Sequence, residues 1–370
     1  MLNFYLFTAY NADRAAFAFS PAVPMPTPTG TVFPLTFADE QQATAWCLRE
    51  RRNLVASVHY AAERGYHDIA WRLPHTTLAI LRRHGYLDDA RATLKIGAAS
   101  GRAIGDSDGE GASLNDLGHI HVTLGDHAEA RKLFHLATYI AQAIRSERGV
   151  AASLCNVAFL EMIEGDYPRA IELYQEAYDA AQQLGDPRMQ SVAQHQLGNA
   201  YRAVRQYDIA ITYYLQALTQ RQTIGHRRGQ GETLTELAAL HCERAEHAIA
   251  DAYGQRALGA IESVQDIETG QRLCDVLAEV HHHRGDLPQA ILYGRRAVHL
   301  AQRIRNATKE ARALENLSRS LLAADHLDAA VEGYEQALAI YRDLGRTHNA
   351  QRIAGRLADL APPNELPDAG

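Results

Sequence analysis

The sequence predicts an all-α protein, built as a stack of helix pairs with a repeat of about 40 residues. The main observation is a column of alanines at one constant spacing: Ala90, Ala130, Ala170, Ala210, Ala250, Ala290 and Ala330. Aromatic residues make up only 7% of the chain, which suits packed helices better than a β-sandwich. A chain of 370 residues is also too long for one ordinary core, whereas stacked repeats enlarge their core with every unit.

A second column of small residues keeps the same spacing. Its members are Gly118, Ala158, Gly198, Ala238, Ala278 and Ser318. A small side chain lets two helix backbones approach closely, because a larger one would force them apart. We therefore expect each repeat to be two helices in close contact.

Turn residues divide each repeat into its two helices. Gly-Asp pairs stand at Gly125–Asp126, Gly165–Asp166 and Gly285–Asp286. Glycine favours the left-handed end of one helix, and aspartate caps the start of the next. Pro168 and Pro288 then fall in a first helical turn, where proline is tolerated.

The remaining elements follow in chain order. We expect a helix and a proline-rich connector over residues 1–36, then a helical junction over 37–66 that is capped by Asp39. Seven helix pairs fill residues 67–346, and a capping helix covers 347–360. The tail, 361–370, follows two prolines and is predicted to be disordered.

The columns resemble the tetratricopeptide repeat family, as in Gly198, Ala210, Tyr214 and Ala217. The resemblance covers about three quarters of the chain and implies a right-handed superhelical solenoid with a concave groove. The array is thus expected to be a tetratricopeptide-type helical-hairpin solenoid with an N-terminal helical arm.

Two repeats depart from this pattern. Gly254 and Gly294 stand where the family has an aromatic residue, and Tyr253 and Tyr293 are displaced by one position. We expect the units around residues 229–305 to pack less tightly, or to bend.

The junction is similar to that of AfsR-type regulators of actinomycete antibiotic production, in which a nucleotide-binding STAND module precedes a tetratricopeptide region. The similar residues are Ala45-Trp46, Glu50–Leu54 and Asp68–Leu73, followed by Pro74, which should kink its helix. The resemblance implies the sensor or regulatory module of a transcriptional regulator, as a fragment or as a stand-alone relative.

Sequence motifs for catalysis are missing. With only three lysines no phosphate-binding loop of the Gly-x-x-x-x-Gly-Lys type occurs, and no nucleophile or zinc-protease motif is found. We expect no enzyme activity, no cofactor and no metal, although zinc at His281–His283 with Cys242 stays an alternative. Scattered cysteines and no signal peptide indicate a cytoplasmic protein, and a net charge of -7 argues against nucleic acid.

The first helix of each pair lines the groove in this family. Polar or aromatic residues at matching offsets form the predicted partner-binding site: Asn115, His119, Asn156, Phe159, His195, Asn199, Arg202, Glu236, Asp275, Glu279, His282, Glu315 and Arg319. Amides in the early units can bind peptide backbone. The later units carry carboxylates with Arg272, Arg312 and Arg319 interspersed, and this polarity favours an extended peptide or a partner with cationic patches over an acidic tail.

Two functions are compatible with this surface. The first hypothesis is a non-catalytic scaffold that binds a protein or peptide in the groove, without membrane or nucleic acid contact and as a possible homo-oligomer. The alternative is a small-molecule effector sensor, with an enclosed pocket in the groove near Pro74 or near Gly254 and Gly294.

Overall fold

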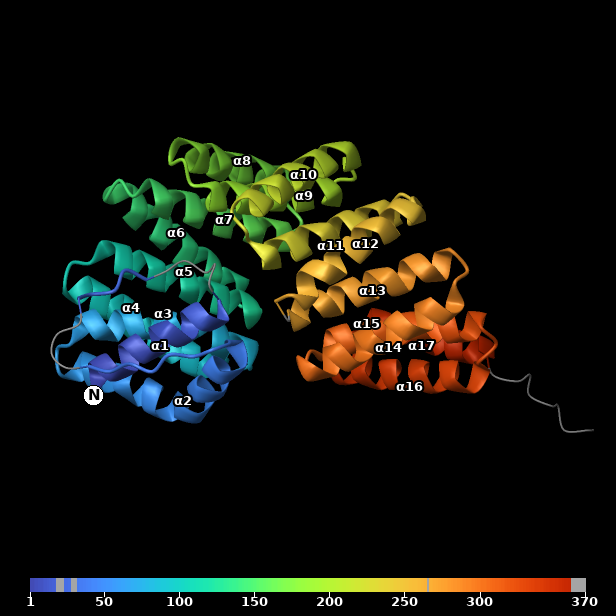
Figure 1. Ribbon diagram of the computed structural model, residues 1–370, viewed down its shortest axis with the longest axis horizontal. Helices are drawn as coiled ribbons and strands as arrows, with labels where there is room; N and C mark the ends of the chain where they lie inside the picture. The colour runs from blue at the N-terminus through green and yellow to red at the C-terminus, as the bar shows by residue number, and fades with distance from the viewer. Residues whose placement is uncertain (18–22, 28–31, 265, 361–370) are drawn as a thin grey trace, which may run out of the picture. The chain divides into compact units, whose positions relative to one another are not determined.

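The computed structural model describes residues 1–17, 23–27, 32–264 and 266–360, and all of its regular structure there is helical. It divides into two compact units, Met1–Tyr213 and Tyr214–Gly370. The predicted tail and part of the proline-rich connector lie outside the described residues. The predicted all-α fold class is confirmed (Figure 1).

Seventeen helices are described. Those of the first unit are α1 (Leu2–Ala16), α2 (Glu40–Glu63), α3 (His67–Arg83), α4 (Leu87–Ala103), α5 (Ser107–Thr123), α6 (His127–Ala143), α7 (Glu147–Glu164), α8 (Tyr167–Gln183) and α9 (Pro187–Ala203). The unit boundary falls in α10 (Tyr207–Thr223). The second unit continues with α11 (Arg227–Glu243), α12 (His247–Glu262), α13 (Ile267–His283), α14 (Leu287–Arg303), α15 (Ala307–Ala323), α16 (Leu327–Asp343) and α17 (Thr347–Leu360).

The predicted turns have the expected chemistry. Gly125, Gly165 and Gly285 have positive φ angles of 80°, 87° and 76°. The carboxylate of Asp126 accepts a hydrogen bond from the backbone N–H of Glu129, at the first turn of α6. Ala245 adopts the same left-handed turn without a glycine, with φ of 60°, so this turn carries backbone strain.

The small-residue column lies where two helices touch. A methyl group at Gly118 of α5 would come within 2.3 Å of the Phe134 ring on α6. Phe134, Tyr174 and Tyr334 occupy equivalent positions on their own helices and are all fully buried. Close backbone approach therefore explains the small residues, and the aromatic ring fills the space beside them.

At Gly254 and Gly294 themselves the expected looser packing is not found. A methyl group at Gly254 would come within 2.5 Å of Leu277, and one at Gly294 within 3.1 Å of Leu317. Leucines of the following repeat thus approach the helix closely at both glycines.

The displaced tyrosines have a partner of their own. Tyr253 stacks on His241 with ring centroids 5.3 Å apart, and Tyr293 stacks on His281 at 5.4 Å. In each case the ring of the second helix covers a histidine at the end of the first helix. Tyr213 stacks on Tyr201 at the equivalent positions one repeat earlier, so this contact recurs along the array.

The N-terminal arm packs on the start of the array. Leu6 and Ala9 of α1 share one buried cluster with Trp46 of α2 and Leu73 of α3, and Figure 1 shows α1 lying alongside α3. The Asp39 side chain caps α2 by accepting from the Gln42 N–H at 2.8 Å, as predicted. α1 is thus anchored to the first repeat.

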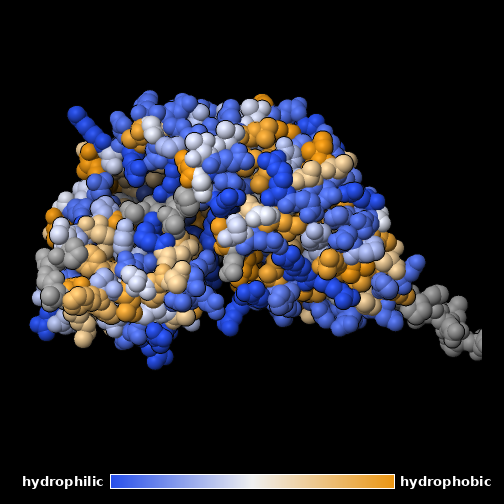
Figure 2. Space-filling view, in the orientation of Figure 1, coloured by the Kyte–Doolittle hydropathy of each residue, from blue (hydrophilic) through white to orange (hydrophobic). Residues whose placement is uncertain are grey.

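The surface is mixed in character. Figure 2 shows apolar side chains scattered among polar ones over the visible face. Of the described helices, none is both long and apolar enough to cross a bilayer.

Candidate functional site

Predicted site residues of the first unit meet at the first helices of neighbouring pairs. The Asn156 amide of α7 donates to Asn115 Oδ1 of α5 at 3.0 Å, and Asn115 donates to the Ser153 hydroxyl at 3.1 Å. His119 Nε2 lies 2.9 Å from Asn156 Oδ1. We call Asn115, His119, Ser153 and Asn156 the amide cluster.

Aromatic rings hold His119 in place within this cluster. Its ring centroid lies 5.3 Å from that of Phe134 and 6.4 Å from that of Phe159, a further predicted site residue. Burial lowers the pKa of His119, an effect that the charge of Arg82 reinforces and that of Asp116 opposes. The imidazole is therefore neutral near pH 7.

A neutral His119 has a defined hydrogen-bonding role. Its Nε2–H donates to Asn156 Oδ1, so the Nδ1 lone pair can accept a further hydrogen bond. The Asn156 amide uses one of its N–H groups on Asn115 and has a second one. The cluster thus offers both a donor and an acceptor, as an extended peptide backbone requires.

The predicted residues of α9 share one face of their helix. His195, Asn199 and Arg202 follow at helical spacing, and the Asn199 amide donates to the Gln196 side chain at 2.7 Å. They extend the same first-helix surface by one more repeat.

Sequence reasoning missed two contributors to this surface. His75 of α3 stands one repeat before Asn115, and its Nδ1 is 2.5 Å from Asp116 Oδ2 while its Nε2 is 3.0 Å from Ser113. The periodic spacing was a signal that could have found it. Asp13 of α1 lies before the repeats and had no such signal.

Asp13 adds a buried carboxyl group next to this pair. Burial raises the pKa of Asp13, Arg14 and His75 act to lower it, and Asp116 acts to raise it. Asp13 is paired with its neighbour Arg14, so the arm adds a buried ion pair close to the His75–Asp116 contact.

In the second unit, three of the four predicted carboxylates are paired with arginines. Arginines one repeat apart on three first helices each contact a carboxylate of the preceding first helix: Arg272 with Glu236 at 3.4 Å, Arg312 with Asp275 at 2.7 Å and Arg352 with Glu315 at 2.7 Å. We call these pairs the Arg–carboxylate ladder. Because it cancels the negative charge, the preference for a cationic partner expected from these carboxylates is not supported.

The last predicted residues lie beside the ladder. His282 Nδ1 is 3.2 Å from the Ser320 hydroxyl, and burial lowers the pKa of His282, with the charges of Arg319 and His283 adding to the effect. Glu279 is 3.9 Å from His283 Nε2. These two histidines and Glu279 lie beside the ladder without being part of it.

The zinc alternative finds no support in the side chains. His281 lies 3.3 Å from Asp286 and stacks on Tyr293, and His283 stacks on His247 at 5.2 Å. Over the part of the chain that the structure describes, no group of three or more His, Cys, Asp or Glu side chains is placed to hold a metal ion.

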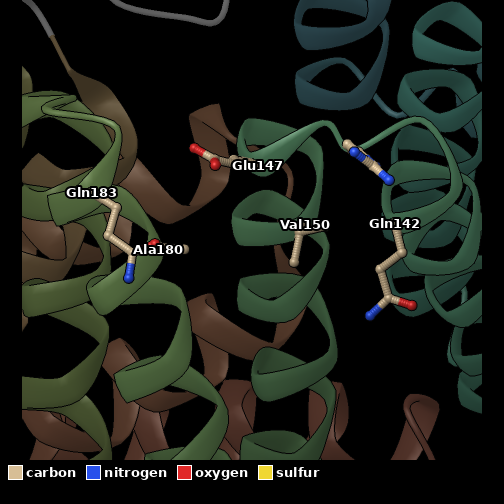
Figure 3. Close-up of a pocket in the computed structure, with 6 residues that line it drawn as sticks. Gln142, Glu147, Val150, Ala180 and Gln183 are labelled. Atoms are coloured by element: carbon tan, nitrogen blue, oxygen red, sulfur yellow. The ribbon is translucent and has the colours of Figure 1, made fainter.

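A pocket of about 330 Å³ lies at the ends of α6, α7 and α8. Figure 3 shows side chains of Gln142, Glu147 and Gln183 around it. None of the predicted site residues lines this pocket, and neither does Pro74, Gly254 or Gly294. It therefore lends no support to the small-molecule alternative, which was expected beside those three residues.

Family models identify the repeats. Tetratricopeptide repeat models match residues 111–144, 193–228 and 273–343, so these segments are tetratricopeptide repeats. No curated protein sequence matches the chain.

Solved structures share the fold at low sequence identity. A Rap protein complexed with competence and sporulation factor has a TM-score of 0.59 and 13% identity, covering 83% of this chain and 81% of that one. A STAND protein with a tetratricopeptide repeat sensor from Pyrococcus horikoshii has a TM-score of 0.59 and 14% identity, covering 86% of this chain and 52% of that one. The Cut9–Hcn1 structure of the APC/C has a TM-score of 0.57 and 14% identity, covering 85% and 59%. These likenesses concern the fold alone.

Proposed function

We propose that the chain is a non-catalytic scaffold that binds an extended peptide on the first-helix surface, around the amide cluster. The observation that carries the proposal is the hydrogen-bonded set of Asn115, Asn156 and His119, which joins two neighbouring repeats. Its side chains are held in place before a ligand arrives, so little conformational entropy is lost on binding.

The proposed biological role is that of a sensor or regulatory module of a cytoplasmic transcriptional regulator. In support, the solved structures with this fold include a Rap protein in complex with a factor and a STAND protein with a repeat sensor. Stacked first helices are also the surface that repeat proteins commonly use for binding.

The test is a double substitution, Asn156→Ala with Asn199→Ala. The full chain is applied to an array of blocked 12-residue peptides of random sequence, and dissociation constants are measured for the peptides that bind. Losing two amides that hydrogen-bond the peptide is expected to weaken binding about 10-fold or more.

The control removes two amides from a second helix, with Gln175→Ala and Gln182→Ala on α8. Asn156 also holds Asn115 and His119, so its loss lowers stability by about 1 kcal/mol, and binding is measured well below the melting midpoint. If both double variants bound the same peptides equally well, the amide cluster would not be the binding site.

A further inference from the structure

One side of the Arg319 guanidinium has no partner. Its Nε and Nη2 atoms are both buried, and neither makes a hydrogen bond to any described residue. These two nitrogens point their N–H bonds from the same edge of the planar group, and this edge binds a carboxylate through two parallel hydrogen bonds. A complete carboxylate-binding fork is thus unused.

The neighbouring carboxylates do not fill it. Glu315, on the same helix, is held by Arg352, and Asp275 of α13 is held by Arg312. Glu279 of α13 is within 3.9 Å of His283, and no ion pair of 4 Å or less joins it to Arg319 in the described chain. The ladder therefore pairs Glu315 and Asp275 with other arginines, and Arg319 is left without an ion pair to them or to Glu279.

The charges of Arg319 and Glu279 both act on the neighbouring His282, in opposite directions. The positive charge of Arg319 is one of the causes that lower the pKa of His282, after burial. His282 and Ser320 form a hydrogen-bonded pair beside it on α13 and α15. An incoming carboxylate would meet a positive charge and polar side chains on the first helices of the second unit.

We propose that Arg319 is a binding site for a carboxylate group, carried by an acidic peptide side chain or by a small free dicarboxylate. The proposal rests on the binding role of the first-helix surface, but it uses residues of the second unit only. Arg319 is half-buried, and turning its side chain toward a ligand breaks no hydrogen bond at Nε or Nη2. Ligand binding then satisfies two donors that the free protein leaves unpaired.

Carboxylate binding at Arg319 also changes the pKa of the neighbouring His282. A carboxylate bound at Arg319 neutralises the charge that helps to lower the pKa of His282, so this pKa rises on binding. By linkage, the carboxylate binds more tightly as the pH falls through the range in which His282 takes up its proton.

The experiment follows the Arg319 Nε–H signal of the nitrogen-15-labelled full chain by NMR. The probes are glutarate and the blocked peptide Ala-Glu-Ala-Glu-Ala, with glutaramide and Ala-Gln-Ala-Gln-Ala as neutral controls. We expect the signal, assigned by its loss in Arg319→Gln, to shift with a carboxylate probe and not with the amides. A shift with glutarate means that a small free dicarboxylate is sufficient for binding. A shift with the peptide alone means that the ligand is an acidic side chain of a peptide.

Three variants make the result decisive. Arg319→Gln and Arg319→Lys should each weaken carboxylate binding about 10- to 100-fold, because lysine keeps the charge but lacks the fork. Arg303→Gln, an exposed arginine of α14, should bind like the unchanged protein. Arg319→Gln should also melt at the same temperature or higher, because it removes an unpaired buried group.

Two outcomes would overturn the proposal. One is a silent Arg319 signal with both carboxylate probes. The other is a melting temperature that drops by several degrees in Arg319→Gln while binding persists, since this result makes the arginine purely structural. The Asn156→Ala, Asn199→Ala variant should keep the Arg319 response, and Arg319→Gln should keep binding to peptides that depend on Asn156, so the two proposals fail separately.

Discussion

His119 links the amide cluster to pH. Its neutral ring donates to Asn156 and packs against Phe134 and Phe159. Protonation would place a charge among two aromatic rings and would leave no acceptor at Nδ1. The folded cluster therefore disfavours the proton that the unfolded chain accepts with an ordinary pKa of about 6.5.

The sign of the pH effect follows from this lowered pKa. Above about pH 6.5 both states are neutral, and below it the unfolded chain takes up the proton first. We expect the free energy of unfolding to fall as the pH drops from 7.5 to 5.5, with a contribution of at most about 1.4 kcal/mol per pH unit from His119. The free energy of unfolding, measured with urea, should depend less steeply on pH in His119→Gln than in the unchanged protein. His299→Gln, which replaces an exposed histidine, should leave this pH dependence as it is.

At the scale of helices, α12 depends on a close approach to the following repeat. Gly254 faces Leu277 of α13, which is fully buried, whereas nothing lies within 4 Å of a methyl group built at Gly259 of the same helix. The two glycines thus have the same helical propensity and opposite surroundings.

Alanine substitutions separate these effects. Gly259→Ala should raise the free energy of unfolding by about 0.5–1 kcal/mol, since it removes backbone freedom from the unfolded chain. Gly254→Ala should lower it by about 1–3 kcal/mol, because the added methyl overlaps Leu277. Thermal and urea unfolding measure both. Equal stabilisation by the two substitutions would mean that Leu277 moves aside freely.

At the scale of the whole molecule, each unit carries its own buried thiol. Cys47 of the first unit is 2% exposed and Cys274 of the second is 1% exposed. Burial raises the pKa of each thiol to about 12. At neutral pH both are therefore protonated and shielded, and react only when their surroundings open.

Modification of Cys47 therefore reports the opening of the first unit, and modification of Cys274 reports the opening of the second. We expect a thiol-modifying reagent at pH 8 to react with neither Cys47 nor Cys274 of the native protein. In the same time it should modify both thiols completely in urea-denatured protein. Peptide mass spectrometry locates the modification. Rising urea should then label each thiol as its own unit opens. Labelling of Cys47 or Cys274 in native protein at the rate of a free thiol would contradict the burial described above.

The sequence predicted the helices well because their determinants are local and periodic. Ala130 and Gly118 mark packing contacts, and Asp126 marks a cap, each with a fixed chemical role. Partners across repeats were harder to foresee, because they depend on side-chain directions. Asn115 and Asn156 were both named, but their hydrogen bond was not.

Two expectations depended on contacts between repeats. The carboxylates of the second unit were expected to favour an extended peptide or a cationic partner, and three of them pair with the arginines at positions 272, 312 and 352. The units with Gly254 and Gly294 were expected to be loose, although leucines of the next repeat approach both glycines closely. In both cases the compensating residue lies in a neighbouring repeat and becomes visible only when the repeats are stacked.

The Arg–carboxylate ladder also limits how this chain can change in length. Each rung takes its cation from one repeat and its anion from the repeat before, and the last rung uses Arg352 of the final helix, α17. Duplicating or deleting one whole repeat within the ladder leaves every rung with both partners. Inserting a different number of residues within one of these helices rotates one partner of a rung away from the other, because the helix has 3.6 residues per turn. Changes by whole repeats therefore keep the ladder, and changes within a helix break it.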